Sequence, residues 1–276
     1  MDRIARLGRL GTTVEKVEIA TAAAFKKRRA APTLGCARAD AHREDGRRIF
    51  GATIGYVQRI DAAFLQEYAE KKKIRITIEA LPGTFSAPGC ALARITPDDA
   101  DDSSEIDVKQ IAQAFRIGKG RTFYDDPRFG LIVLSEIAVR ALSPAVNDPG
   151  TAIGVIGTLV RLFSLWNASA ETGDESSTDV TFDRVAAPEL SVHDMSDDAF
   201  SAIARDGASM IEVAIRLQKA FASLASIEDE AMRDAAKHHS RIALARAEHS
   251  LKLSEDRKIV RELAQKVASA FLPLFP

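Results

Sequence analysis

The sequence predicts an α+β fold, with a small antiparallel β-containing N-terminal part followed by a predominantly helical bundle. Residues Ile74–Leu81 alternate between apolar and polar for most of their length, which is typical of a half-buried strand. A second β-prone segment, Cys90–Ile95, follows after the turn residues Pro82-Gly83. Beyond Ser196, apolar residues recur at helical spacing almost to the end of the chain.

Residues Met1 to about Arg29 are predicted to form a helix. Its apolar positions follow heptad a and d spacing at Leu7, Leu10, Val14, Val17, Thr21 and Ala24. Because glycines lower helix propensity here and two seam positions hold Thr and Ala, we expect a packed or self-associating helix rather than a long coiled coil. The basic run Lys26–Arg29 is interpreted as the solvated end of this helix, with a lipid-headgroup contact as the alternative.

An irregular segment, residues 30–46, is predicted to link this helix to the β-containing part. The stretch Arg48–Val57 is β-prone, and Asp61 is placed to cap a helix that covers Ala62 to Lys73. We expect the inward face of that helix to carry Phe64, Leu65 and Tyr68.

An acidic stretch, Thr96–Glu105, follows the second strand. It lacks the residue order of an EF-hand, so a solvated linker is favoured over a calcium site. A short amphipathic helix is predicted next, from Val108 to Phe115, and Gly118-Lys119-Gly120 ends it. These two glycines do not have the spacing of a phosphate-binding P-loop.

The densest polar punctuation lies in Arg121–Thr151, where two Asp-Pro pairs bracket an apolar helix. Aspartate at an N-cap followed by proline is a strong helix-start signal. It predicts one helix over Pro127–Leu142, capped by Asp126, and a second helix capped by Asp148. The short connector Ser143–Asn147 would join the two helices as a hairpin or a bent pair.

A further strand is predicted at Asp179–Val185, and the rest of the chain is predicted to be helical. One helix begins at Ser196, bends at Asp206-Gly207 and extends to about Leu224. Another covers Asp229 to about Leu253. The last begins at Ser254, and we expect it to bury Ile259, Leu263, Val267 and Phe271.

The chain has 276 residues, enough for one large domain or two ordinary ones with a sizeable core. The segments above suggest an N-terminal helix and linker (1–45), a small β-rich domain (46–97) and a mainly helical domain (98–276). Acidic and basic residues nearly balance, with a formal net charge of −1, so we expect no nucleic-acid partner.

The two cysteines, Cys36 and Cys90, have no metal-ligand spacing, which favours a reducing compartment over a disulfide framework. The most apolar stretch, Ala152–Trp166, is short and contains Arg161, so no transmembrane span is expected in this chain. Charged residues near the N-terminus argue against a secretory signal. As given, the polypeptide is expected to be soluble.

No catalytic residue and no cofactor are predicted, because the histidines are dispersed and none accompanies a nucleophile. His238, His239 and His249 are expected to face solvent on a helix. Around the Asp-Pro pairs, carboxylates and an amide could hold a small ligand or a hard cation such as magnesium, with the identity of any metal open. The candidate residues of this site are Arg121, Asp125, Asp126, Arg140, Ser143, Asn147 and Asp148.

The chain contains two distinctive motifs, D-D-P-R-F-G-L at residues 125–131 and A-L-S-P-A-V-N-D-P-G-T-A at residues 141–152. With them, the chain resembles the bacterial family called domain of unknown function 2254, whose members are predicted inner-membrane proteins. Family members usually have several transmembrane helices ahead of this region. The resemblance therefore implies a soluble portion that follows the last span, or a member that lacks the spans, with the basic first helix on the cytoplasmic side.

The resemblance implies a cytoplasmic, self-associating or regulatory domain of a membrane protein, of a channel or transporter type. We expect a homo-oligomer, and contact with the inner membrane through an upstream region. The alternative is an enzyme-like site for a divalent cation or small ligand at the Asp-Pro stretch. Of the two, the non-enzymatic role is favoured.

Overall fold

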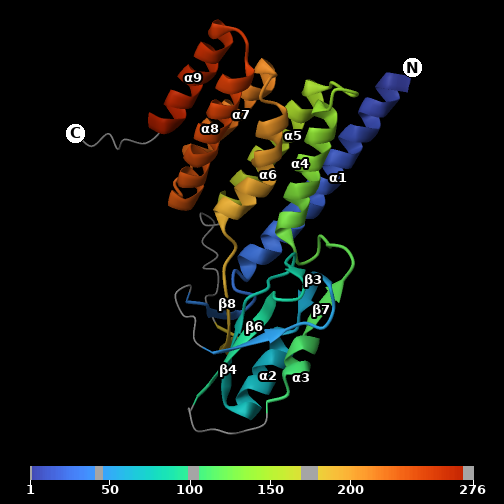
Figure 1. Cartoon of the computed structure of the whole chain (residues 1–276), viewed down its shortest axis with the longest axis vertical. Coiled ribbons are helices and arrows are strands. Elements are labelled where there is room, and N and C mark those ends of the chain that lie inside the picture. The colour runs from blue at the N-terminus through green and yellow to red at the C-terminus, as the bar shows by residue number, and fades with distance from the viewer. Residues whose placement is uncertain (1, 41–45, 99–105, 169–179, 270–276) are drawn as a thin grey trace, which may run out of the picture. The chain divides into compact units, whose positions relative to one another are not determined.

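The computed structural model describes residues 2–40, 46–98, 106–168 and 180–269, with side chains from residue 11 onward (Figure 1). Contacts divide the chain into two compact units. The sheet unit contains Ala23–Phe129 and Gly173–Leu190, and the helical unit contains Met1–Ala22, Gly130–Thr172 and Ser191–Pro276. The predicted α+β class, with a helical C-terminal part, is confirmed.

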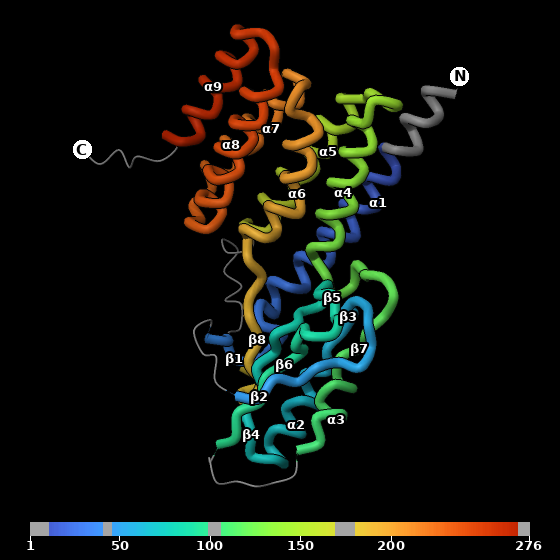
Figure 2. The backbone as a smooth tube through the Cα atoms, viewed as in Figure 1, coloured from blue at the N-terminus to red at the C-terminus, as the bar shows by residue number. Residues whose placement is uncertain are grey.

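Two sheets form the sheet unit. The larger has the strand order β1-β8-β4-β6-β2 and the smaller the order β5-β3-β7 (Figure 2). The strands are β1 (Cys36–Arg38), β2 (Arg47–Phe50), β3 (Gly55–Ile60), β4 (Ile74–Ile78), β5 (Phe85–Ser86), β6 (Ala91–Pro97), β7 (Phe115–Gly118) and β8 (Phe182–Ala187). The larger sheet is mixed, because β8 pairs in parallel with both β1 and β4 while the other pairs are antiparallel.

The core of the sheet unit follows from the alternation in β4. Ile74, Ile76 and Ile78 are each at most 1% exposed, and Ile76 lies opposite Ile95 of β6. Helices α2 (Ala62–Lys72) and α3 (Val108–Gln113) supply the fully buried Leu65 and Ile111 to the same core. In this way the helices complete a single apolar core around the sheets.

Local chemistry sets where α2 begins and ends. The Asp61 side chain accepts a hydrogen bond from the Phe64 amide at 3.0 Å, which confirms the predicted cap. Lys73 ends the helix in the left-handed conformation, with φ of 50°. The expected burial of Leu65 and Tyr68 is confirmed, but that of Phe64 was wrong: its side chain is 36% exposed.

The helix predicted up to Phe115 ends earlier than expected. Helix α3 stops at Gln113, and Phe115 is the first residue of β7, where it lies opposite Ile60 of β3. The amphipathic pattern of the segment does not reveal this strand, because its pairing partner lies far away along the chain. As a result, β7 positions Arg116 next to β3.

The helical unit contains α5 (Pro149–Ala168), α6 (Val192–Asp206), α7 (Ile211–Ala225), α8 (Glu230–Ser250) and α9 (Ser254–Ser269). Two more helices, α1 (Asp2–Ala30) and α4 (Pro127–Leu142), each contribute residues to both units. Helix α7 contacts α5, α8 and α9, and α6 contacts α8. Phe200 joins these helices, because its ring lies 5.6 Å from that of Phe163 and 5.1 Å from that of Phe221, centroid to centroid.

The helix predicted from Ser196 to Leu224 is two helices. Ser191 caps α6 by accepting a bond from the Asp194 amide at 3.2 Å, and α6 ends at Asp206. The chain resumes helical geometry only at Ile211. The break occurs where Gly207 leaves room for Val213, since a Cβ at Gly207 would collide with that side chain.

Helix α9 begins at Ser254 as predicted but presents a different face to the core. Val260, Ala264 and Val267 are buried, whereas Ile259 is 44% exposed, so the expected burial of Ile259 was wrong. Val267 was predicted correctly. Phe271, most of the acidic stretch (residues 99–105) and residues 169–179 lie outside the described residues, as do the side chains of Leu7 and Leu10.

By length and composition, helix α5 is long and apolar enough to cross a membrane. The expectation of no span rested on the shortness of the apolar stretch, although α5 has 20 residues, and on Arg161, whose guanidinium pairs with Glu18 at 2.7 Å. Val155, Leu159 and Phe163 of α5 are buried, and the helix contacts α7. Core helices satisfy the same criteria, so α5 by itself is weak evidence for a span.

Candidate functional site

The Asp-Pro pairs act as helix caps, as predicted. Asp126 accepts a hydrogen bond from the Phe129 amide at 3.2 Å, and Asp148 accepts one from the Thr151 amide at 3.2 Å. Asp148 also accepts a bond from the Thr151 hydroxyl at 2.6 Å. Both carboxylates are thus occupied by bonds to the protein itself.

The connector between α4 and α5 is explained by backbone geometry. Asn147 has φ of 48° and donates its amide to the Ser143 carbonyl at 2.8 Å, while the Ser143 hydroxyl donates to the Arg140 carbonyl at 2.7 Å. Asparagine tolerates this left-handed conformation better than most residues do. Arg140 is exposed in the last turn of α4, where a cation suits the helix dipole.

The candidate residues fall into two groups. Arg121, Asp125 and Asp126 belong to the sheet unit, whereas Arg140, Ser143, Asn147 and Asp148 belong to the helical unit. Within the described ranges, no group of three or more His, Cys, Asp or Glu side chains has the geometry to hold a metal ion. Caps and turns account for the helical-unit residues, whereas Arg121, Asp125 and Asp126 form ion pairs in the sheet unit.

In the sheet unit, Arg121 holds Asp126 with two hydrogen bonds. The Arg121 Nε lies 2.6 Å from Asp126 Oδ2, and its Nη2 lies 2.9 Å from Oδ1. The side chain of Asp126 is 1% exposed, so this is a buried, two-point ion pair. Gly83 packs directly against it, because a Cβ at Gly83 would lie 2.6 Å from Asp126 Oδ2.

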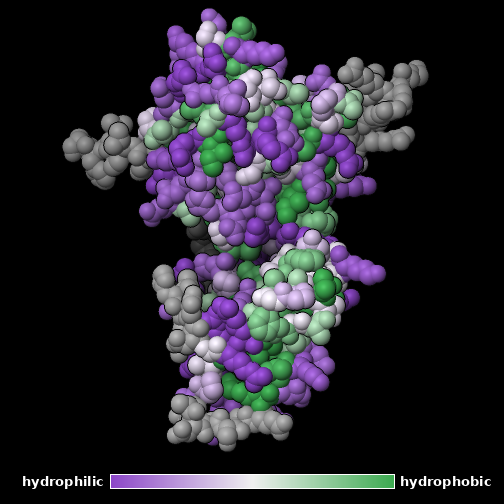
Figure 3. All heavy atoms as spheres, viewed as in Figure 1, coloured by the Kyte–Doolittle hydropathy of each residue, from purple (hydrophilic) through white to green (hydrophobic). Residues whose placement is uncertain are grey.

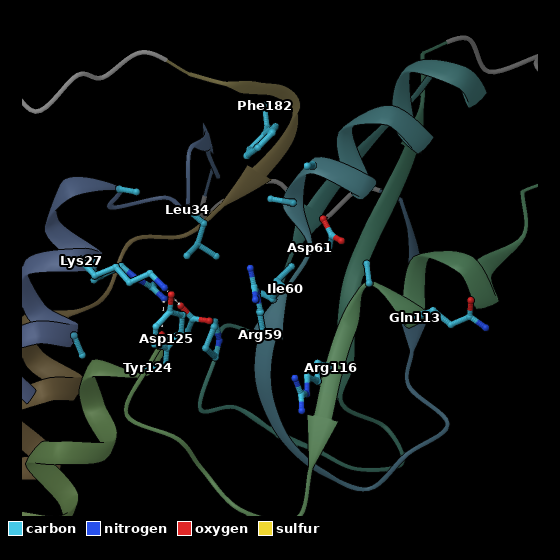
Figure 4. Close-up of a pocket in the computed structure, with 17 residues that line it drawn as sticks. Lys27, Leu34, Arg59, Ile60, Asp61, Gln113, Arg116, Tyr124, Asp125 and Phe182 are labelled. Atoms are coloured by element: carbon cyan, nitrogen blue, oxygen red, sulfur yellow. Dashed lines mark hydrogen bonds and ion pairs between the residues drawn. The ribbon is translucent and has the colours of Figure 1, made fainter. Parts of the chain in front are cut away.

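Beside this pair, a pocket of about 650 Å³ opens in the sheet unit. Its polar lining comes from α1, β3, α3, β7 and the segment before α4 (Figure 4). The charged side chains that line it are Lys27, Arg28, Arg59, Asp61, Arg116 and Asp125. A pocket of this size is typical of sites for small molecules.

Two of these charges already neutralise each other. The Lys27 Nζ lies 2.6 Å from Asp125 Oδ1 and also 3.5 Å from the centroid of the Tyr124 ring (Figure 4). Asp61 is the cap of α2. Because both carboxylates have protein partners, the positive charge of the pocket lies mainly with its three arginines.

Arg28 is the unusual member of this set. It is only 4% exposed; its Nη2 donates to the Asp125 carbonyl oxygen at 3.1 Å, and its buried Nη1 has no hydrogen-bond partner. Burial lowers the pKa of Arg28, while the charges of Asp125 and Asp126 act in the opposite direction. A buried donor without an acceptor lowers the stability of the fold, which points to an acceptor that the protein chain itself does not supply.

Arg59 and Arg116 form a second unusual arrangement. They lie directly opposite each other on the antiparallel strands β3 and β7, and both are exposed. Like charges at directly opposed positions destabilise a sheet. Both side chains line the pocket (Figure 4).

The sequence did not reveal this pocket. The basic run at the end of α1 was interpreted as solvated, and for Arg28 this was wrong, since the side chain is buried. Arg59 and Arg116 are 57 positions apart along the chain and meet only through the pairing of β3 with β7. No local pattern indicates such a pairing.

His239 also differs from expectation. It was predicted to face solvent, but it is 3% exposed, in contact range of the rings of Phe200 and Phe221. Its Nε2 lies 3.4 Å from Asp197 Oδ1 and makes no hydrogen bond. Burial lowers the pKa of His239 to about 4, so the imidazole is neutral at pH 7.

Residues 1–223 match the model of the family described as "Predicted membrane protein (DUF2254)". The uncharacterized proteins MT1328 of Mycobacterium tuberculosis and Mb1321c of Mycobacterium bovis are each 33% identical to this chain over 124 residues. The aligned part covers 44% of this chain and 23% of each relative. The chain thus matches less than a quarter of the length of these relatives. No solved structure matches it.

Proposed function

The chain belongs to this family of predicted membrane proteins, and from that premise we propose that it is a cytoplasmic regulatory domain, of a channel or transporter type, which associates with copies of itself. In this role the domain binds a ligand in the pocket lined by Lys27, Arg28, Arg59 and Arg116, which we call the basic pocket. The bound and free states then differ in how the domain contacts its own copies. The activity of the whole protein follows from that difference.

The observation that carries the proposal is the position of the basic pocket on α1. Lys27 and Arg28, in the last turn of this helix, line the pocket, while the earlier residues of the same helix belong to the helical unit. A ligand that contacts Arg28 changes the free energy of one end of a long helix. Such a helix is suited to couple binding with a change elsewhere in the protein.

The lining of the pocket favours binding over catalysis. The described residues that line it include no serine, cysteine or histidine, the usual nucleophiles and bases of enzymes. Its two carboxylates, Asp61 and Asp125, are engaged in a helix cap and an ion pair. What the pocket offers to a ligand is fixed positive charge beside apolar surface.

Self-association has a narrower basis. The predicted seam of α1 is used inside the chain, because Val17, Thr21 and Ala24 are buried. Exposed apolar side chains of the helical unit include Ile19, at 63%, and Leu253, at 61%. Figure 3 shows hydrophobic groups set among hydrophilic ones on its visible face. Single exposed apolar side chains are common on monomeric proteins, so an assembly that uses Ile19 is expected to be weak and concentration-dependent.

Sedimentation velocity over a wide concentration range tests the self-association. The proposal predicts a sedimentation coefficient that rises with concentration for the chain. The variant Ile19→Glu should shift the rise to higher concentration, and Glu15→Lys, an exposed charge change on the same helix, serves as the control. A monomer at every concentration would contradict self-association.

The two cysteines allow a test of location in the full-length protein. Cys90 is exposed, whereas Cys36 is buried and its pKa is raised to about 12 by that burial. A membrane-impermeant maleimide should therefore label Cys90 only after the inner membrane is opened. Loss of that signal in Cys90→Ser identifies the site. Labelling of intact spheroplasts at Cys90 would overturn the cytoplasmic assignment.

A further inference from the structure

We propose that the basic pocket binds a phosphate group, as a phosphomonoester or diphosphate, through Arg28, Arg59 and Arg116. This inference deepens the proposed function, on which it rests only in that both use the same pocket. The phosphate oxygens accept hydrogen bonds from the guanidinium groups, and the rest of the ligand lies against the apolar part of the lining. Each of the three arginines contributes a separate argument.

Arg28 supplies a donor that has no partner in the protein. Its side chain is 4% exposed and fixed on one side by the Asp125 carbonyl oxygen, which leaves the buried Nη1 without a partner. A buried N–H that lacks an acceptor loses its hydration without compensation. Because Nη1 has almost no accessible surface, the guanidinium must turn toward the pocket for an anion oxygen there to become its acceptor, and the buried stem limits the entropy lost in that turn.

Arg59 and Arg116 supply two further guanidinium groups from facing positions of β3 and β7. Neither arginine forms an ion pair with a carboxylate of the described residues. Both side chains line the same pocket (Figure 4). Two guanidinium groups at opposed positions repel each other in the empty pocket. An anion between them converts the repulsion into two charge-assisted interactions.

The number of cations indicates the class of anion. One arginine fork satisfies a carboxylate, which has two oxygens and a single charge. A phosphate group has three acceptor oxygens and a charge of roughly −1.5 to −2 at pH 7, which matches three arginines better. Lys27 adds little, because its ammonium is already paired with Asp125.

The apolar part of the lining indicates that the phosphate is attached to a larger group. Leu34, Ile60 and Phe182 line the same pocket, and the volume of about 650 Å³ exceeds what a phosphate alone requires. A soluble phosphate ester and the headgroup of an anionic lipid share this chemistry. The pocket itself does not distinguish them, so the experiment includes one arm for each source.

Binding to the full chain can be measured by titration calorimetry with inorganic pyrophosphate, and by co-sedimentation with phosphatidylcholine vesicles that contain or lack phosphatidic acid. We expect saturable binding in at least one arm. Pyrophosphate alone would identify a soluble phosphate, and phosphatidic acid alone a lipid headgroup. The absence of binding in both arms would overturn the inference.

Four variants separate the pocket from general charge. Arg59→Gln and Arg116→Gln change exposed side chains and should each weaken binding about tenfold or more, as expected for a lost charge-assisted bond. Arg28→Met should abolish binding; it removes the unpaired Nη1 together with the Nη2 bond to the Asp125 carbonyl oxygen, so circular dichroism checks that the protein stays folded. Arg48→Gln, an exposed strand arginine outside the pocket, is the control. Equal loss in Arg48→Gln would contradict a specific site.

Sedimentation with saturating pyrophosphate then separates this inference from the proposed function. Binding that leaves the assembly unchanged would contradict regulation through self-association but retain the phosphate site. Concentration-dependent assembly without binding of pyrophosphate or phosphatidic acid would retain self-association but contradict the phosphate site. The two ideas can therefore fail independently.

Discussion

Arg121 donates two hydrogen bonds to Asp126, and Asp126 also caps α4 by accepting a hydrogen bond from the Phe129 amide. One buried carboxylate therefore links the segment before α4 to the helix itself. Its counterpart at the start of α5, Asp148, makes cap bonds only to Thr151. The two Asp-Pro pairs look alike in the sequence, but we expect Asp126 to contribute more to the free energy of unfolding than Asp148 does.

The substitution Asp126→Ala should lower the free energy of unfolding by about 2–4 kcal/mol, because it leaves the Arg121 guanidinium, which is only 15% exposed, without its partner. Asp148→Ala is the matched control and should cost about 1 kcal/mol, the usual effect of a lost N-cap. Scanning calorimetry of both variants makes the comparison. Equal losses would mean that the Arg121 contact adds nothing to the cap.

Gly83→Ala should destabilise the sheet unit more than Gly89→Ala does. Both glycines have positive φ, 96° and 89°, so each substitution carries backbone strain of about 1–2 kcal/mol. Only at Gly83 does the added Cβ meet other atoms, Asp126 Oδ2 at 2.6 Å and Arg121 Nη2 at 2.7 Å. We expect about 1–3 kcal/mol of additional loss from this overpacking. Similar urea midpoints, followed by circular dichroism, would contradict it.

Gly130→Ala should destabilise the helical unit, because α1 and α4 approach each other at this glycine. A Cβ there would collide with the Thr21 side chain, whereas a Cβ at the exposed Gly154 of α5 has open space. We therefore expect a loss of about 1–3 kcal/mol for Gly130→Ala and a gain of up to about 1 kcal/mol for Gly154→Ala. The single tryptophan, Trp166 in α5, reports unfolding of this unit. The same sign for both variants would contradict the close approach.

His239 should make the stability of the helical unit depend on pH. Its pKa is lowered to about 4 by burial, so the unfolded chain binds a proton near pH 6.5 while the folded chain does not. Stability is therefore fully present above pH 6.5 and falls as the pH drops toward 4, by up to about 3 kcal/mol.

The variant His239→Phe removes this dependence, and its ring suits the aromatic surroundings of Phe200 and Phe221. Urea unfolding followed at Trp166 between pH 7 and about 4.5 measures the difference from the parent protein. His249→Gln, a change at an exposed histidine, serves as the control. A parent protein and His239→Phe variant with parallel pH curves would show that His239 titrates normally.

Much of the fold could be predicted because it depends on local chemistry. The alternation in β4 and the caps at Asp61, Asp126 and Asp148 all act within a few residues, and each appears in the structure. The parallel pairing of β8 could not be predicted, since it joins segments separated by the whole of α4 and α5. The buried face of a helix also differed from the predicted one, as in α9, where Val260 is buried and Ile259 is exposed.

The basic pocket shows the same limit. Arg121 and Asp125 were named as candidate residues of a ligand site, and in the structure each forms an ion pair within the sheet unit. The arginines that line the pocket were missed, because Arg28 was expected to be solvated and the pairing of Arg59 with Arg116 depends on strand register. Charge in the sequence indicates where cations are, but only the fold decides which of them meet.

The most direct test of the central claim is a crystal structure of the chain grown with inorganic pyrophosphate. The account predicts electron density for a phosphate group within hydrogen-bond distance of the Arg28 guanidinium, with Arg59 and Arg116 turned toward it. An Arg28→Met crystal grown identically should lack that density. A well-ordered pocket that is empty at saturating pyrophosphate, or an anion bound only elsewhere on the chain, would contradict the account.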